Sequence, residues 1–158
     1  MDEQAFNTLY DATAKPLWRY IANVSGSAEI ADDLLQECYF RLLRSGPPDM
    51  KISDARPYLF RIAANLMHDR WRRGEQLPIE AAHDPATEIH PERKLDAAHM
   101  LRNLKPRARQ LLWLAYVEEM THREIAVVTG LNVMSVRILL LRARREARML
   151  LSSKGGER

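Results

Sequence analysis

With 158 residues the chain can form one domain or two small ones, because domains commonly span about 50 to 200 residues. The 46% hydrophobic and 28% charged residues are typical of a globular protein and exclude a disordered chain. A formal net charge of +3 permits a polyanionic partner without requiring one, so the placement of the charge matters more. The single cysteine, Cys38, excludes an internal disulfide and a zinc site built from cysteines.

The N-terminus and the hydropathy of the chain indicate its compartment. No segment approaches the about 20 apolar residues that span a bilayer, and the start MDEQAFNTLY is acidic where a secretion signal is basic. We therefore expect a cytoplasmic protein in a reducing compartment.

Apolar residues at helical spacing predict three helices in the first half of the chain. The first covers residues 5–24, where Pro16 is expected to kink or divide it. The second covers residues 28–44, with Ser27 as its N-cap, and paired prolines end it. The third is expected to begin at Ser53 or Asp54 and to end at the glycine after Arg73.

Residues 75–92 have a different composition, with three prolines, five acidic residues and no Lys or Arg. This composition predicts an acidic flexible linker between a domain at 1–74 and a domain at 93–153. Four further helices are expected at about 92–103, 105–118, 121–129 and 132–151. No period-two pattern indicates a strand, so the predicted fold class is all-α, with two small helical domains.

The stretch THREIAVVTGLNVMSVRILLLRARREARMLL carries the strongest local pattern. Thr121 and Glu124 form a capping box, and Gly130 suits a left-handed turn position. Asn132 can cap the next helix, and Val136 then packs against the first. This order predicts a helix-turn-helix, whose second helix enters the major groove of DNA.

At 100° per residue, the second helix of this motif separates into two faces. The apolar face contains Val136, Leu140, Ala143, Ala147 and Leu150, and the opposite face contains Arg137, Arg142, Arg145 and Arg148. Arginines suit phosphates and guanine edges, although a solvated basic face is the alternative. Ile138 and Leu141 lie within the basic face, where they either contact thymine methyl groups or form a surface that an inhibitor covers.

Five blocks follow one another along the chain: FNTLYDATAKPLWRYI, AEIADDLLQECYFRLLR, YLFRIAANLMHDRWRR, LRNLKPRARQLLWLAYVEEMTHREIA and SVRILLLRARR. Together they resemble the extracytoplasmic-function sigma factors of the sigma-70 family. The resemblance implies an alternative sigma factor that directs promoter-specific transcription initiation. It implies core RNA polymerase (beta and beta-prime subunits), promoter DNA and an anti-sigma factor as partners, the last membrane-bound in many members. It implies no enzymatic activity, cofactor, metal or small-molecule substrate.

The resemblance also assigns residues to three surfaces. The residues assigned to core polymerase binding are Asp32, Asp33, Leu35, Gln36, Glu37, Tyr39 and Phe40. The alternative interpretation is that the acidic residues form a solvated, exposed face. The minus-ten element falls to Arg61, Asn65, Asp69, Arg70, Trp71, Arg72 and Arg73, with residues 45–54 holding a flipped base. The minus-thirty-five element falls to Arg123, Ser135, Arg137, Arg142, Arg145 and Arg148.

Some assignments keep two interpretations. Trp71 is either a stacking platform for a base or a core tryptophan. The linker either mimics nascent RNA in the polymerase or serves as a spacer. Ile138, Leu139 and Leu141 are apolar where the family commonly has polar or basic residues.

Three other functions are alternatives to a sigma factor. An enzyme is disfavoured because the histidines are scattered, without a metal or nucleophile motif: His68, His83, His90, His99 and His122. A dimeric helix-turn-helix regulator explains only the last sixty residues. A sigma-like decoy that captures an anti-sigma factor gains support from Ile138 and Leu141.

Overall fold

The structure is a computed structural model that describes residues 1–47, 50–74 and 100–155, and in these ranges it contains helices and turns without a strand. The elements in chain order are α1 (Glu3–Ser25), α2 (Ala28–Ser45), α3 (Ile52–Arg72), α5 (Pro106–Leu112), η2 (Trp113–Val117), α6 (His122–Thr129) and α7 (Val133–Gly155). The all-α prediction is confirmed. The predicted linker lies outside the described residues, and the domain boundaries stay predictions.

Local capping signals set the ends of the first helices. The Ser27 hydroxyl accepts a hydrogen bond from the Ile30 amide at 3.2 Å and begins α2 as predicted. Pro16 lies inside α1 without dividing it. The predicted start of α3 was wrong by one or two residues, since the helix begins at Ile52 and its cap position, Lys51, makes no side-chain cap bond.

The helix predicted at 105–118 changes its winding halfway. It is an α-helix as far as Leu112 and then a π-helix, in which the Glu118 amide donates to the Trp113 carbonyl at 3.2 Å. This wider turn buries Trp113 and Leu114. A π-turn inside a longer helix depends on tertiary packing and has no periodic signature, so the sequence pattern did not indicate it.

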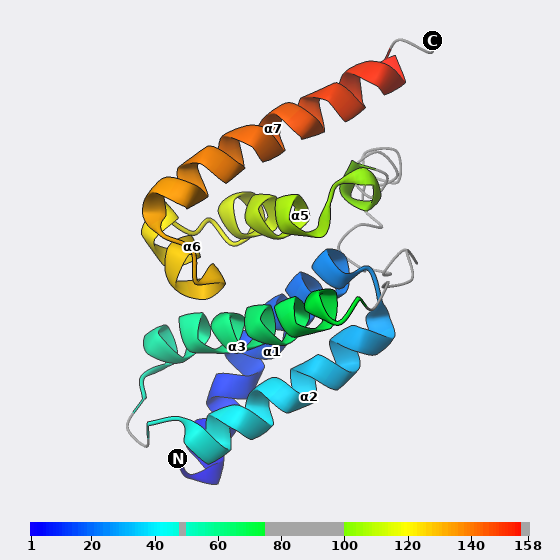
Figure 1. Ribbon diagram of the computed structural model, residues 1–158. Coiled ribbons are helices and arrows are strands. Elements are labelled where there is room, and N and C mark those ends of the chain that lie inside the picture. The colour runs from blue at the N-terminus through cyan, green and yellow to red at the C-terminus, as the bar shows by residue number, and fades with distance from the viewer. Residues whose placement is uncertain (48–49, 75–99, 156–158) are drawn as a thin grey trace.

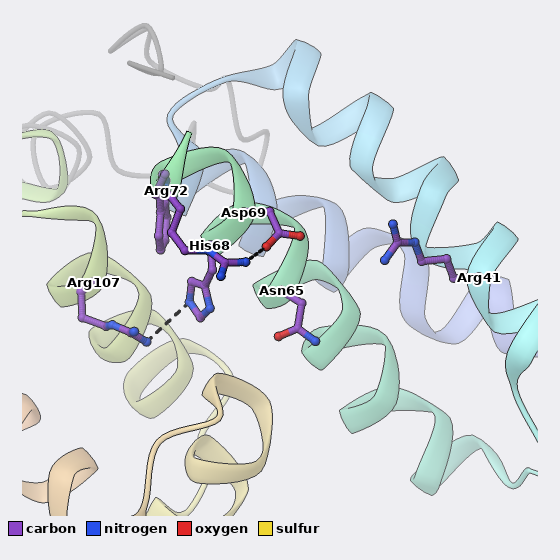
Figure 2. Close-up of a pocket in the computed structure, with 7 residues that line it drawn as sticks. Arg41, Asn65, His68, Asp69, Arg72 and Arg107 are labelled. Carbon is purple, nitrogen blue, oxygen red and sulfur yellow. Dashed lines mark hydrogen bonds and ion pairs between the residues drawn. The ribbon is translucent and has the colours of Figure 1, made fainter. Parts of the chain in front are cut away.

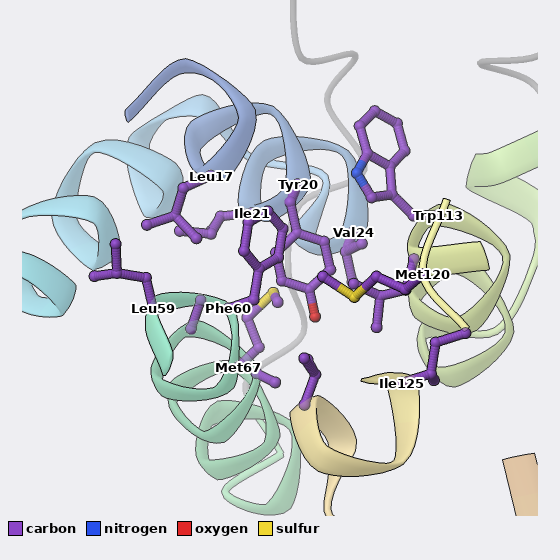
Figure 3. Packing of buried hydrophobic residues seen from close by; sticks show 14 of the residues in the cluster. Leu17, Tyr20, Ile21, Val24, Leu59, Phe60, Met67, Trp113, Met120 and Ile125 are labelled. Carbon is purple, nitrogen blue, oxygen red and sulfur yellow. The ribbon is translucent and has the colours of Figure 1, made fainter. Parts of the chain in front are cut away.

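The N-terminal half (α1–α3) and the C-terminal half (α5–α7) pack on each other. Helix α3 lies against α6, and α1 lies against α5 (Figure 1). Buried side chains of the two halves form one hydrophobic cluster, in which Met120 and Ile125 lie near Tyr20 and Met67 (Figure 3). Burial of apolar side chains therefore stabilises the contact between the halves as well as each half.

Polar side chains also cross this contact, and they are paired with one another. Gln110 of α5 is fully buried, and its amide nitrogen donates to the Tyr20 hydroxyl of α1 at 3.0 Å. Its amide oxygen lies 3.0 Å from the Nε2 atom of His68 of α3. At the other end of α3, Arg56 donates to the Glu118 carboxylate at 2.8 Å. These bonds fix the register of the halves, because a buried polar group without a partner is costly.

We expect Gln110→Leu to lower the free energy of unfolding by about 1–3 kcal/mol, because the buried Tyr20 hydroxyl loses its amide partner. Urea unfolding followed by circular dichroism measures the change. As a matched control, Gln4→Leu at an exposed position of α1 should stay within about 0.5 kcal/mol of the wild type. Wild-type stability of Gln110→Leu would contradict the bridging role of this residue.

Candidate nucleic-acid interface

Helices α6 and α7 form the predicted helix-turn-helix. Thr121 and Glu124 make both bonds of the capping box, at 3.2 and 3.0 Å, and Gly130 has the left-handed φ of 78°. The Asn132 side chain accepts from the Ser135 amide at 2.8 Å at the start of α7. In the described ranges no single helix is long and apolar enough to cross a membrane; α6 and α7 qualify only as a pair, bent by 100°. That bend is typical of a helix-turn-helix.

The two faces of α7 lie where the sequence pattern placed them. The apolar residues Val136, Leu140, Ala143 and Ala147 are buried, and Leu150 is half-buried. Arg123 on α6 is exposed. The arginines of the opposite face of α7 are also exposed, namely Arg137, Arg142, Arg145 and Arg148. Ser135 is half-buried. Helix α7 is separated from α3 by α5 and α6 (Figure 1), and its four arginines are exposed in the packed arrangement.

The structure adds one contact and one exposed apolar residue to this surface, neither of which the sequence analysis identified. Arg144 donates from Nε to the Tyr116 hydroxyl at 2.6 Å, and its guanidinium carbon lies 5.7 Å from the centre of the Tyr116 ring. Met134 extends the apolar positions Ile138 and Leu141 into a stripe on α7, at exposed fractions of 63%, 46% and 46%. The spacing of four and three residues could have revealed Met134, whereas the Tyr116 contact crosses the fold.

Helix α3 carries the residues assigned to the minus-ten element. Asn65, Asp69 and Arg72 line one hollow at its surface, and Arg72 is paired with Asp69 (Figure 2). Arg61 and Arg73 are exposed, Arg70 is half-buried, and none of the three lines the hollow. Trp71 also lines the hollow, but it is half-buried against the core, with its ring 5.2 Å from that of His68. Residues 48–49 of the expected base-holding loop lie outside the description.

On α2, most residues of the expected polymerase-binding surface are accessible. Asp32, Asp33, Gln36 and Phe40 are exposed, and Leu35 and Glu37 are half-buried. Tyr39 was misplaced on this surface. It is 5% exposed, and its hydroxyl is 2.5 Å from that of Thr13. The Tyr39 ring instead packs edge-to-face on Phe6 and at a tilt against Tyr10, both of α1, so an aromatic residue next to the apolar stripe belongs to the core.

The electrostatics at the contact between the halves centre on His68. Burial lowers the pKa of His68 below its usual 6.5, and the Arg107 and Arg72 guanidinium groups lower it further, while the bond to Gln110 opposes them. Arg107 lies 3.5 Å from His68 and 3.4 Å from the Gln110 oxygen. Among the described residues, no group of three His, Cys, Asp or Glu side chains is arranged to hold a metal ion; His83, His90 and His99 fall outside them.

An all-α chain with an arginine-faced helix-turn-helix and a second basic helix defines a class of DNA-binding transcription proteins. The Sigma-70 region 2 model matches residues 9–76, and the Sigma-70 region 4 model matches residues 94–146. The chain belongs to the extracytoplasmic-function sigma factors of the sigma-70 family.

Individual relatives agree with the family models. The chain is 28% identical to the sigma factor SigE of Mycolicibacterium smegmatis, over 99% of this chain and 71% of that protein. It is 29% identical to the RNA polymerase sigma-E factor of Streptomyces avermitilis, over 96% and 86% of the two chains. Its fold matches the sigma factor RpoE from Bartonella quintana, solved in complex with the anti-sigma factor NepR, with a TM-score of 0.74 and 19% identity over 93% and 96% of the chains.

We expect the His68 environment to make the packed structure sensitive to acid. Because the pKa of His68 is lower in the folded chain than in the unfolded one, its contribution to stability is complete above about pH 6.5 and is lost as the pH falls below that value. Thermal unfolding between pH 7.5 and pH 5 should therefore show a smaller loss of stability for His68→Gln than for the wild type. Parallel pH profiles of the two proteins would contradict this prediction.

Proposed function

We propose that the chain is an alternative sigma factor that binds core RNA polymerase and directs it to a specific promoter, without catalysis of its own. The observation that carries this proposal is the pairing of two basic helices on separate halves of one chain, within the two sigma-70 regions. A single helix-turn-helix would fit many regulators. The second basic helix, α3, separates a sigma factor from them.

For polymerase binding we propose the exposed part of α2. Asp32, Asp33 and Gln36 offer carboxylates and an amide beside the exposed ring of Phe40. Such a mixed acidic and aromatic surface complements a basic partner helix. The Trp18 indole donates to Asp32 at 2.8 Å and holds that carboxylate in place.

For promoter DNA we propose two sites. On α3, Arg61, Asn65 and Arg72 present phosphate-binding and base-accepting groups to the minus-ten element, a role in which the remaining assigned residues of that helix assist. On α7, Arg137, Arg142, Arg145 and Arg148 face the major groove of the minus-thirty-five element, with Arg123 contacting the backbone.

For regulation we propose an anti-sigma factor that covers the apolar stripe of α7. Met134, Ile138 and Leu141 lie among the arginines, so a protein bound there would exclude DNA from the same face. RpoE, whose fold is similar, was solved with an anti-sigma factor bound. A membrane-bound anti-sigma factor stays a prediction.

Run-off transcription tests the function directly. Purified core polymerase of the source organism should initiate on selected genomic fragments only when the protein is added. Asp33→Ala should weaken binding to core by about tenfold, because one carboxylate is lost from a charged interface. Asp11→Ala, an equal change of charge at an exposed site on α1, should leave binding unchanged. Initiation that is independent of the protein would exclude a sigma factor, and dimerisation on a palindrome would favour the regulator.

Promoter reading by α7 is tested with Arg142→Ala. If the guanidinium contacts a base edge, promoter binding by the holoenzyme should weaken by about 1–3 kcal/mol. If it contacts phosphate alone, the dependence of binding on salt should become shallower instead. The control is Arg44→Ala on α2. Unchanged affinity and salt dependence, with anti-sigma binding retained, would favour the sigma-like decoy.

A further inference from the structure

The hollow beside α3 has walls from three helices of both halves. Its volume is about 740 Å³, within the range of small-molecule sites. It is lined by Arg41 of α2, Asn65, His68, Asp69, Trp71 and Arg72 of α3, and Arg107 of α5. In Figure 2, Arg107 points towards His68 from one side of α3, and Arg41 lies on the other side. Arg41, His68 and Arg107 were not among the residues assigned to the minus-ten element.

The charges of this hollow do not balance among the described residues. Its one carboxylate, Asp69, is paired with Arg72, and Arg41 is paired with Glu37 at 2.9 Å. Among the described residues, Arg107 contacts the neutral side chains of His68 and Gln110, and none of the described carboxylates lies within ion-pair distance of it. Burial lowers the pKa of Arg107, because desolvation of the half-buried guanidinium disfavours its charged form.

An anion with several oxygens would remove this imbalance. Guanidinium groups donate two parallel hydrogen bonds to a phosphate, and three of them line this hollow, two of which also pair with a carboxylate. The rings of His68 and Trp71 and the Asn65 amide add groups that can contact a nucleobase. We propose that the hollow between α3 and α5 is a binding site for a small anion with two or more linked phosphates, such as a nucleoside diphosphate.

This site has a consequence for the arrangement of the halves. Arg107 comes from α5, whereas the other lining residues come from α2 and α3. A ligand that contacts Arg107 and α3 together binds the packed arrangement better than a separated one, and so it stabilises the packed form. The site shares Asn65, Asp69, Trp71 and Arg72 with the surface proposed for the minus-ten element, but its test needs neither polymerase nor promoter.

The experiment is calorimetric titration of the full chain with sodium pyrophosphate and, separately, with ADP, in buffer without phosphate. We expect saturable binding at one site, weakened by at least about tenfold in Arg107→Gln. Arg44→Gln is the matched control, because it removes the same charge from an exposed position outside the hollow, and its affinity should stay within about twofold of the wild type. Tighter binding of ADP than of pyrophosphate would assign a nucleotide, and equal binding would assign the phosphates alone.

Two results would overturn the proposal. One is that neither pyrophosphate nor ADP shows saturable binding. This result overturns the proposal even if a single-stranded oligonucleotide binds and its binding depends on Arg107. The other is equal weakening by Arg107→Gln and Arg44→Gln, which indicates general attraction to a basic surface. Circular dichroism checks the fold of each variant. Should Arg107→Gln not fold, Arg41→Gln takes its place, with weakened binding expected and wild-type binding counting against the site.

Discussion

The arrangement of the chain depends on the hydrogen bonds of one enclosed amide. Gln110 has a donor and an acceptor to satisfy and no access to water, and it finds the Tyr20 hydroxyl on α1 and the His68 ring on α3. Because both partners belong to the N-terminal half, the amide is satisfied only when the halves are packed in this register. Burial of the surrounding apolar side chains holds the two halves together but does not select one orientation, whereas the hydrogen bonds of the amide do.

This register also decides which surfaces remain accessible. Helix α3 packs against α6 on one side, while Arg72 lines the hollow and Arg61 is exposed. Helix α7 follows α6 on the side away from α3 (Figure 1), and its arginines Arg137, Arg142, Arg145 and Arg148 are exposed. The two helices with proposed roles on DNA therefore differ, since one is held in the contact between the halves and the other is not.

Features determined by neighbouring residues could be predicted from the sequence. The capping box at Thr121, the left-handed Gly130 and the caps at Ser27 and Asn132 each involve residues within a few positions, and each was found as expected. Helical periodicity likewise predicted the buried and exposed faces of α7.

The features that sequence reasoning missed depend on residues distant in the chain. Tyr39 lies in the core, where its hydroxyl group pairs with the Thr13 hydroxyl of another helix. The π-turn depends on the packing around Trp113. The contact between Gln110 and Tyr20 joins residues 90 positions apart, and no periodicity can indicate such a pair. In the sequence, the contact is indicated only by the polar residue Gln110 next to the apolar residues of RQLLWL. The candidate DNA and polymerase residues came from family resemblance, and their roles stay proposals.

The packing of α3 against α6 competes with any macromolecule that binds the same faces of these helices. Any macromolecule that must reach the faces that α3 and α6 hide from each other can bind only those molecules whose halves have come apart. If closing is favoured by about 1.4 kcal/mol, roughly one molecule in ten is open, and the measured dissociation constant is about tenfold above the intrinsic one. Affinities measured for the isolated protein would then describe the ease of opening as much as the quality of the contacts formed.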